Sequence, residues 1–258
     1  DAPEEAVVIW TTTPWTLPAN VAAAVDPTAE YSGVRTSLGI DWVMSTRVDD
    51  LFGEGADVAR TALGAELVGK AYVGPFDELA AQAEVAHRVV AWDMVSDNEG
   101  TGVVHIAPGC GAEDFELGKR EEIPTLVPVD EAGHFTEEYG WLAGMATADA
   151  AEPITAHLEK NGVLVRSGTI DHRFPVCWRC GTDLIFRVVE EWFIAADKVR
   201  QPMIEAAATV NWVPEQYGKR MEDWLRNMGD WCISRKRYWG LPLPFYRAPS
   251  GEITVIGS

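Results

Sequence analysis

The sequence has few basic residues and no long hydrophobic stretch. Lysine and arginine number 21 against 40 aspartate and glutamate residues, so the formal net charge is −19. A chain this acidic lacks the basic face of a general nucleic-acid-binding protein, although contact with a single nucleotide end stays open. No apolar run approaches the roughly 20 residues of a membrane-spanning helix, and no signal segment opens the chain. We expect a soluble, cytoplasmic protein without a membrane partner.

Cysteine is also scarce. The four cysteines are too few for a disulfide framework in a chain of 258 residues, which indicates a reducing compartment. Cys177 and Cys180 form one Cys-x-x-Cys pair, which can hold one side of a tetrahedral zinc ion. No second pair appears, and no thioredoxin-like context supports a redox role. The pair therefore indicates half of a zinc site.

Apolar runs and periodicity predict a mixture of strands and helices. Strands are expected at residues 6–9, 21–25, 31–35, 40–45, 87–92, 103–106, 125–129, 163–165 and 184–194. Helices are expected at residues 57–65 and 77–83, which are alanine-rich, and at 112–118, 146–161, 195–208 and 216–227. The 6–9 run is expected to be buried.

The segment Trp10–Asn20 is the most unusual part of the sequence. It carries four threonines, two tryptophans and two prolines directly after the apolar run 6–9. Each proline removes a backbone donor and fixes φ, so the chain should leave the sheet in a stiff, irregular loop. Threonine hydroxyls on such a loop can hold a polar ligand against a rigid scaffold. The alternative is a threonine-rich edge strand and turn.

A second candidate region joins a strand, a glycine-bearing loop and a helix. His105 lies within an apolar run that ends at Pro108, and Asp114 falls in the first turn of the expected helix. Backbone donors at a helix start, with a carboxylate beside them, can build a ligand site. The alternatives are a helix-capping Asp114 and a core histidine. The glycine spacing does not fit a dinucleotide-binding loop.

Six of the eleven tryptophans lie in the last third of the chain. Residues 230–244 interleave aromatic side chains with Arg235, Lys236 and Arg237, an arrangement that can stack on and pair with a nucleotide. The alternative is a packed aromatic segment with solvated cations.

These motifs together resemble one family. Five of them stand in the order found in isoleucyl-tRNA synthetases: Trp10–Asn20, Gly100–Gly109, Asp114, Cys177–Cys180 and Asp230–Gly240. The valyl and leucyl relatives carry Arg-Pro in place of Thr13-Pro14. The chain resembles the inserted editing domain, connective peptide 1, and the return into the catalytic domain. The two ATP-site signatures of the family are absent, so no aminoacyl-adenylate formation is expected.

The resemblance implies an α/β fold. A distorted β-barrel editing domain with peripheral helices is expected at residues 1–180, and a strand-and-helix return segment toward the class I catalytic domain at 181–258. The implied activity is hydrolysis of valine wrongly esterified to tRNA(Ile). Such editing is needed because a pocket made for isoleucine cannot exclude valine, a limit for which isoleucyl-tRNA synthetase is itself the usual example.

The resemblance also implies catalytic roles. Asp114 would pair with the cationic α-amino group of the substrate. The hydroxyls of Thr11, Thr12 and Thr13 would bind the terminal adenosine, the ester and an attacking water. No Ser-His-Asp or Cys-His arrangement supports a covalent route, so direct attack by an oriented water is expected. For these roles to hold, the threonine loop and Asp114 must meet at one hollow.

Three further residues are expected to bind the substrate: Trp15, Asn20 and His105, with His105 limiting the size of the side chain. Asn20 could instead brace the loop. The expected partners are the valine-bearing 3′ end of tRNA(Ile) and the rest of the parent synthetase, and the chain is expected to be a monomer. Editing needs no cofactor. Zinc is expected only in the full-length parent, because Arg247–Gly251 replaces a further cysteine pair and the partners of Cys177 and Cys180 would lie outside the chain.

Three other functions fit parts of the sequence. The chain could be a non-catalytic tRNA-docking module that uses the aromatic-basic segment. It could be the editing domain of a valyl-type relative acting on threonyl-tRNA, against which Thr13-Pro14 speaks. It could be a stand-alone deacylase, against which the segment 231–235 speaks, because that segment belongs to the catalytic body in the relatives.

Overall fold

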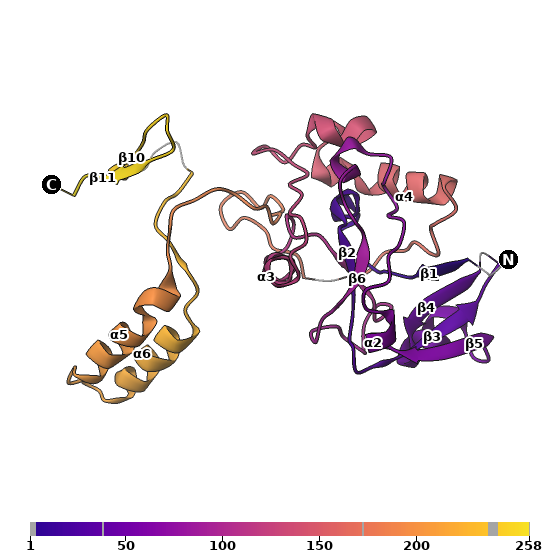
Figure 1. The fold of residues 1–258 in the computed structure, drawn as a ribbon, viewed down its shortest axis with the longest axis horizontal. Helices are drawn as coiled ribbons and strands as arrows, with labels where there is room; N and C mark the ends of the chain where they lie inside the picture. The colour runs from indigo at the N-terminus through magenta and orange to yellow at the C-terminus, as the bar shows by residue number, and fades with distance from the viewer. Residues whose placement is uncertain (1–3, 38, 172, 237–241, 258) are drawn as a thin grey trace. The chain divides into compact units, whose positions relative to one another are not determined.

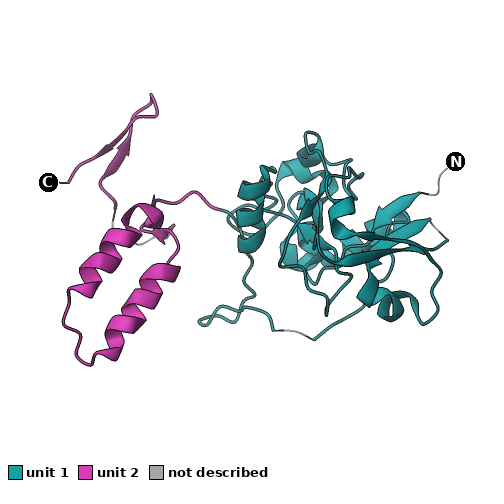
Figure 2. Cartoon of the chain, turned by 60° about the horizontal axis from the view of Figure 1, so that its bottom comes forward, with its two compact units in different colours: residues 1–188 teal, residues 189–258 magenta. Residues whose placement is uncertain are grey.

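The computed structural model describes residues 4–37, 39–171, 173–236 and 242–257. The chain divides into two compact units, residues 1–188 and 189–258 (Figure 2). The boundary expected from the sequence, residue 180, lies slightly before this division. None of the helices in the described residues combines the length and apolar character needed to cross a membrane.

Two sheets organise the first unit (Figure 1). The four-stranded sheet has the order β1-β4-β3-β5, and the three-stranded sheet has the order β6-β2-β7. The strands are β1 (Glu5–Val7), β2 (Ala22–Val25), β3 (Glu30–Arg35), β4 (Ile40–Met44), β5 (Val58–Leu63), β6 (Arg88–Ala91) and β7 (Val104–Ile106). The helices are α1 (Val48–Phe52), α2 (Gly64–Leu67), α3 (Ala112–Glu121) and α4 (Ala151–Lys160). Short 3-10 turns complete the unit: η1 (Pro14–Ala19), η2 (Ser45–Arg47), η3 (Ala80–Gln82), η4 (Glu137–Leu142) and η5 (Thr147–Asp149).

Strand β2 is the central element of the three-stranded sheet. All four of its residues are buried, and they pair parallel with β6 and antiparallel with β7. A strand covered on both faces reads as a continuous apolar run, which is why residues 21–25 were predictable as a strand. In this register Ala23 lies opposite His105, so the buried sheet fixes the position of that histidine.

The α/β fold class is confirmed, but a closed barrel is not supported. The described strands form separate sheets. Between the two sheets of the first unit, an isolated bridge joins Trp10 to Val104, and the Met44 N–H donates to the Thr101 carbonyl at 2.9 Å. Pro14 and Pro18 lack the N–H groups that would extend the ladder beyond β1. The run at residues 6–9 was expected to be a buried strand. Only its residues 6 and 7 belong to β1, which is a short, partly exposed edge strand.

Several predicted elements are wrong. Residues 58–63 form β5, not a helix: pairing with β3 outweighs the weak helical preference of their alanines. The ranges 125–129 and 163–165 form no strand, and 184–194 contains only β8 (Phe193–Ile194). The helix expected at 146–161 begins at Ala151 and ends before Asn161, and Gly162 adopts a φ of 70°.

Three apolar clusters form the core of the first unit. The largest surrounds β2, and a small third cluster lies around Val34, Val43 and Val48. The second cluster contains Trp15 and Leu17 of η1 together with Phe76, Tyr139 and Ile154. The proline-braced segment is therefore anchored from behind by packed side chains.

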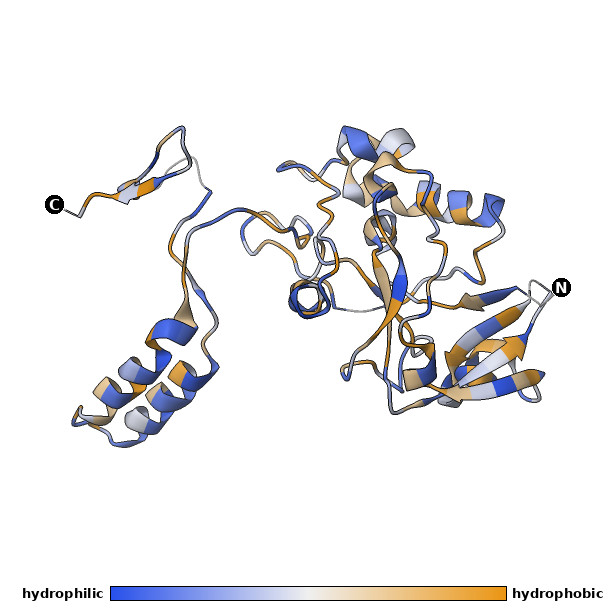
Figure 3. Ribbon diagram, viewed as in Figure 1, coloured by the Kyte–Doolittle hydropathy of each residue, from blue (hydrophilic) through white to orange (hydrophobic). Residues whose placement is uncertain are grey.

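The second unit is built on two helices, α5 (Ala196–Ala208) and α6 (Gln216–Asn227), as the sequence predicts. Strand β8 pairs with β9 (Trp231–Cys232), and β10 (Phe245–Arg247) pairs with β11 (Ile253–Val255). Hydrophilic and hydrophobic residues alternate along both helices (Figure 3). The predicted aromatic-basic segment falls partly on residues 237–241, which lie outside the described residues.

Candidate functional site

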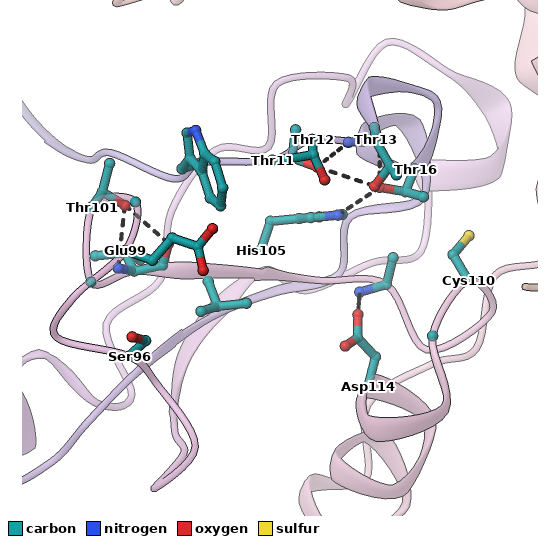
Figure 4. Close-up of a pocket in the computed structure, with 17 residues that line it drawn as sticks. Thr11, Thr12, Thr13, Thr16, Ser96, Glu99, Thr101, His105, Cys110 and Asp114 are labelled. Carbon is teal, nitrogen blue, oxygen red and sulfur yellow. Dashed lines mark hydrogen bonds between the residues drawn. The ribbon is translucent and has the colours of Figure 1, made fainter. Parts of the chain in front are cut away.

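The threonine loop and the start of α3 border one cavity of about 340 Å³ (Figure 4). Three segments line it, around residues 10–16, 96–107 and 110–114. Thr11, Thr12, Thr13, His105 and Asp114 are all among its lining residues. The two segments that the sequence singled out thus meet at a common hollow, whose volume lies at the lower end of the range of small-molecule sites, about 300–1,000 Å³.

Hydrogen bonds within the loop hold its hydroxyls in place. The Thr13 N–H donates to Thr11 Oγ1 at 3.0 Å, and the Thr11 and Thr13 hydroxyls lie 3.3 Å apart. Pro14 opens η1, where its missing N–H costs nothing. Within the described part of the chain, the Thr12 hydroxyl has no hydrogen-bond partner, so it can serve a ligand.

Trp15 and Asn20 do not line the cavity. Trp15 is turned away from it and packs in the second apolar cluster, 8% exposed. Asn20 is buried behind the wall, where its Nδ2 donates to the Ala22 carbonyl at 2.9 Å and approaches His105 Nδ1 at 3.3 Å. Asn20 therefore braces the site, and Trp15 anchors the loop.

His105 is a buried, neutral side chain on the cavity wall. Its Nε2 lies 2.8 Å from Thr16 Oγ1, which in turn donates to the Thr13 carbonyl at 2.9 Å (Figure 4). Burial lowers the pKa of His105 to about 4, because an imidazolium would lose its hydration there. With both ring nitrogens engaged, His105 is poorly placed to act as a general base.

Asp114 supplies a carboxylate at the cavity edge. It lies in the first turn of α3, which begins after Gly111, and its Oδ2 accepts a hydrogen bond from the Ala107 N–H at 2.8 Å. Burial raises the pKa of Asp114, partly offset by that hydrogen bond. A partly desolvated carboxylate attracts a cation more strongly than an exposed one.

The charge of the lining favours a cation. Among the described residues it includes two carboxylates, Glu99 and Asp114, and neither lysine nor arginine. Such a lining suits an ammonium group and repels phosphate. The thiol of Cys110 also borders the cavity, but burial, with a contribution from the charge of Asp114, raises its pKa to about 12, so it is not a thiolate at neutral pH.

Sequence reasoning missed several lining residues. Trp10, Thr16 and Thr101 stand inside the recognised motifs but received no role, whereas Ser96 and Glu99 come from the loop before Gly100, which has no motif of its own. The glycine at position 100 was the one signal in the sequence. In the structure its φ is 65°, and a Cβ there would lie 2.9 Å from the Trp10 ring. Only glycine suits that combination of conformation and close approach.

The Cys-x-x-Cys pair does not fit a closed metal site. Cys177 and Cys180 lie in a turn in which the Gly181 N–H donates to the Cys177 carbonyl at 2.8 Å. In the described part of the chain, no group of three or more His, Cys, Asp or Glu side chains is placed to hold a metal ion. A structural zinc needs four ligands, and this pair supplies two.

The chain is similar to known proteins over nearly its whole length. The family model described as tRNA synthetases class I (I, L, M and V) matches residues 7–258. The isoleucine–tRNA ligases of Methanothermobacter thermautotrophicus and Thermococcus kodakarensis are 44% and 43% identical over 98% and 99% of the chain, matches that cover 24% and 25% of those ligases. The chain thus spans about a quarter of the length of these relatives.

A solved structure has a similar fold. The crystal structure of GlLeuRS-CP1 is matched at a TM-score of 0.56 and 15% identity, over 66% of this chain and 86% of that one. The mixed α/β fold is therefore that of a synthetase CP1 domain.

Proposed function

Because the chain belongs to the class I tRNA synthetases, we propose that the cavity of its first unit is an editing site that hydrolyses mischarged aminoacyl-tRNA. The proposed substrate is valyl-tRNA(Ile), since the relatives with high identity are isoleucine–tRNA ligases. The second unit is the return toward the catalytic part of a longer synthetase. The partners are the 3′ end of tRNA(Ile) and that synthetase, and the chain acts as a monomer.

The observation that carries the proposal is the convergence of Asp114 and the threonine hydroxyls on one cavity. An aminoacyl ester presents a cationic α-amino group next to its carbonyl. Asp114 binds the ammonium with an oxygen not used by the Ala107 N–H. The hydroxyls of Thr11, Thr12 and Thr13 then face the ester and the terminal ribose.

Hydrolysis proceeds by direct attack of water. The water oxygen bonds to the ester carbonyl carbon, the bond from that carbon to the ribose oxygen breaks, and a proton passes to the ribose oxygen, which releases valine and tRNA. The threonine hydroxyls orient the water, so positioning supplies most of the rate. The protonated Cys110 and the fully engaged His105 support a route without a protein nucleophile.

Size selection rests on His105. Its ring lines the cavity and is held by Thr16 and Asn20, so it cannot turn aside for a larger side chain. Valine fits beside it, and the extra methylene of isoleucine does not.

The test is deacylation by the intact chain of three substrates: valyl-tRNA(Ile), isoleucyl-tRNA(Ile) and threonyl-tRNA(Val). We expect hydrolysis of the first only. Asp114→Asn, which can still accept from the Ala107 N–H, should lower that rate at least about 100-fold. The control is Glu113→Gln, which removes the same charge from the neighbouring, exposed position of α3 and should leave the rate unchanged.

Other outcomes would reject the proposal. Binding of tRNA without deacylation of any of the three would identify a docking module. Preference for threonyl-tRNA(Val) would identify a valyl-type editing domain. Equal rates for Asp114→Asn and the unaltered chain would remove the carboxylate from the mechanism.

A further inference from the structure

Hydrogen bonds continue from the cavity wall to a tyrosine outside it. The hydroxyl of Tyr72 donates to Asn20 Oδ1 at 2.6 Å. Tyr72 lies beside β6, where its N–H donates to the His87 carbonyl at 3.3 Å and Ala71 bridges to Arg88. The order across the sheet is therefore the segment 71–72, β6, β2 and β7. Tyr72 is not among the residues that line the cavity.

The donors and acceptors of this chain of bonds run in one direction. The Tyr72 hydroxyl and the Ala22 carbonyl together orient the Asn20 amide, because one donates to Oδ1 and the other accepts from Nδ2. The remaining N–H of Nδ2 points to His105 Nδ1, so this ring nitrogen must be an acceptor. The ring proton of the neutral histidine then lies on Nε2 and is donated to Thr16 Oγ1.

The last bonds of the chain reach the threonine loop. Since Thr16 Oγ1 receives the proton of His105, its own hydrogen is directed to the Thr13 carbonyl. Thr13 in turn donates its N–H to Thr11 Oγ1. The orientation of the Tyr72 hydroxyl is thus transmitted through buried groups to the residues that face the cavity.

We propose that Tyr72 is a positioning residue, which selects the Nε2–H tautomer of His105 through Asn20 and thereby holds the threonine loop in its working geometry. The inference rests on the proposed editing function for its effect on rate, but its structural part stands without that function. Tyr72 touches no substrate.

Removal of the Tyr72 hydroxyl would favour the opposite direction of donation in this series of hydrogen bonds. Without Tyr72 as donor, the buried Asn20 Oδ1 is left unsatisfied, which is an unfavourable state for a polar atom. A donor that can replace it is His105, with its proton moved to Nδ1 and the amide turned over. Nε2 then becomes an acceptor, Thr16 donates to it, and the Thr13 carbonyl keeps only the Thr16 N–H, at 3.0 Å. The Ala22 carbonyl opposes this reversal, so we expect a mixture of tautomers.

The experiment compares Tyr72→Phe with Tyr139→Phe in the full chain. Tyr72 is partly buried, whereas Tyr139 is 1% exposed and its hydroxyl has no hydrogen-bond partner within the described residues, so Tyr139→Phe controls for the loss of an interior phenol hydroxyl. The ¹⁵N shifts of His105, assigned with the help of His105→Gln, report which ring nitrogen carries the proton. Deacylation of valyl-tRNA(Ile) gives kcat and KM separately.

The expected result has two parts. Tyr72→Phe moves the His105 ¹⁵N shifts from the pure Nε2–H pattern toward a mixture and lowers kcat about five- to tenfold with KM nearly unchanged, the loss of about one buried hydrogen bond. Tyr139→Phe changes neither. Unchanged His105 shifts in Tyr72→Phe would overturn the proposal, even if the variant were less stable, since Tyr72 would then be a purely structural residue.

The editing function and the positioning role of Tyr72 can be rejected separately. If the unaltered chain hydrolysed no aminoacyl-tRNA while Tyr72→Phe still changed the tautomer of His105, the editing function would be rejected and the positioning role of Tyr72 retained. If the chain were active and both tyrosine variants matched it in kcat and in His105 shifts, the positioning role of Tyr72 would be rejected and the editing function retained.

Discussion

The two compact units of the chain differ in what they bury. The first contains three apolar clusters and encloses a polar cavity bordered by hydroxyls and two carboxylates. In the described part of the second, the only hydrophobic side chains that are fully buried are Ala196 and Leu225, and large aromatic groups such as Trp224 and Trp231 are more than half exposed. A rigid scaffold that can orient water exists in the first unit, so the chemistry is expected there and the second unit is expected to affect it only indirectly.

The largest effect that separates the units is a dependence of stability on pH. All five histidines belong to the first unit. The pKa of His105 is about 4 in the folded chain and about 6.5 when unfolded. Between these values only the unfolded chain binds the proton, so stability is lost as pH falls from about 6.5 to about 4, by about 3 kcal/mol in total.

Denaturant unfolding of the first unit, followed across this pH range, checks the prediction. In His105→Gln that part of the loss should disappear. Asp114 has the opposite effect on the free energy of unfolding, because its raised pKa favours proton uptake by the folded chain. Both proteins contain Asp114, so its contribution cancels when the pH profile of His105→Gln is subtracted from that of the unaltered chain. Identical pH profiles for the two proteins would contradict a buried, neutral His105.

A smaller effect is expected from matched threonine substitutions in the two units. Thr12→Val removes a cavity hydroxyl that serves no other described residue, so the fold should survive while kcat for valyl-tRNA(Ile) falls about 10- to 100-fold. Thr209→Val makes the same change in the second unit, where the hydroxyl donates only to the Ala206 carbonyl at 2.8 Å, and kcat should not change. A comparable loss in both variants would mean that the comparison between the units does not hold for catalysis.

The smallest effect concerns where the first unit ends. Ile185 packs against the second apolar cluster, and the Val188 N–H donates to the Gly109 carbonyl at 3.2 Å. A chain ended at residue 180 loses both contacts, which should lower its stability by about 1–2 kcal/mol relative to one ended at residue 188. Thermal unfolding of the two shortened chains measures the difference. Equal midpoints would favour the boundary at residue 180, which the sequence suggested.

Local patterns predicted the parts of this structure that depend on near neighbours. Strand β2 and the helices α3, α5 and α6 follow from apolar runs and helical periodicity, because their residues are buried or exposed in a regular order. Strand β5 was missed because its alanines favour a helix, whereas pairing with β3 decides their conformation.

At the site, too, local motifs predicted some residues and missed those whose position depends on distant parts of the sequence. The motif order indicated Thr11, Thr12, Thr13, His105 and Asp114, all of which border the cavity. It could not show that Trp15 turns into the core, since a tryptophan packs as readily as it binds. It gave no sign of Tyr72, which meets Asn20 across 52 positions of sequence. Contacts at that separation depend on the sheet order, which no local pattern encodes.

The most direct test of the account is a crystal structure of the chain with an amide-linked, non-hydrolysable valyl-adenosine analogue. We predict that its ammonium lies about 3 Å from a carboxylate oxygen of Asp114, with the carbonyl beside the hydroxyls of Thr11, Thr12 and Thr13 and the valine side chain against His105. An analogue bound away from this cavity, or bound in it with the ammonium directed away from Asp114, would contradict the proposed editing site.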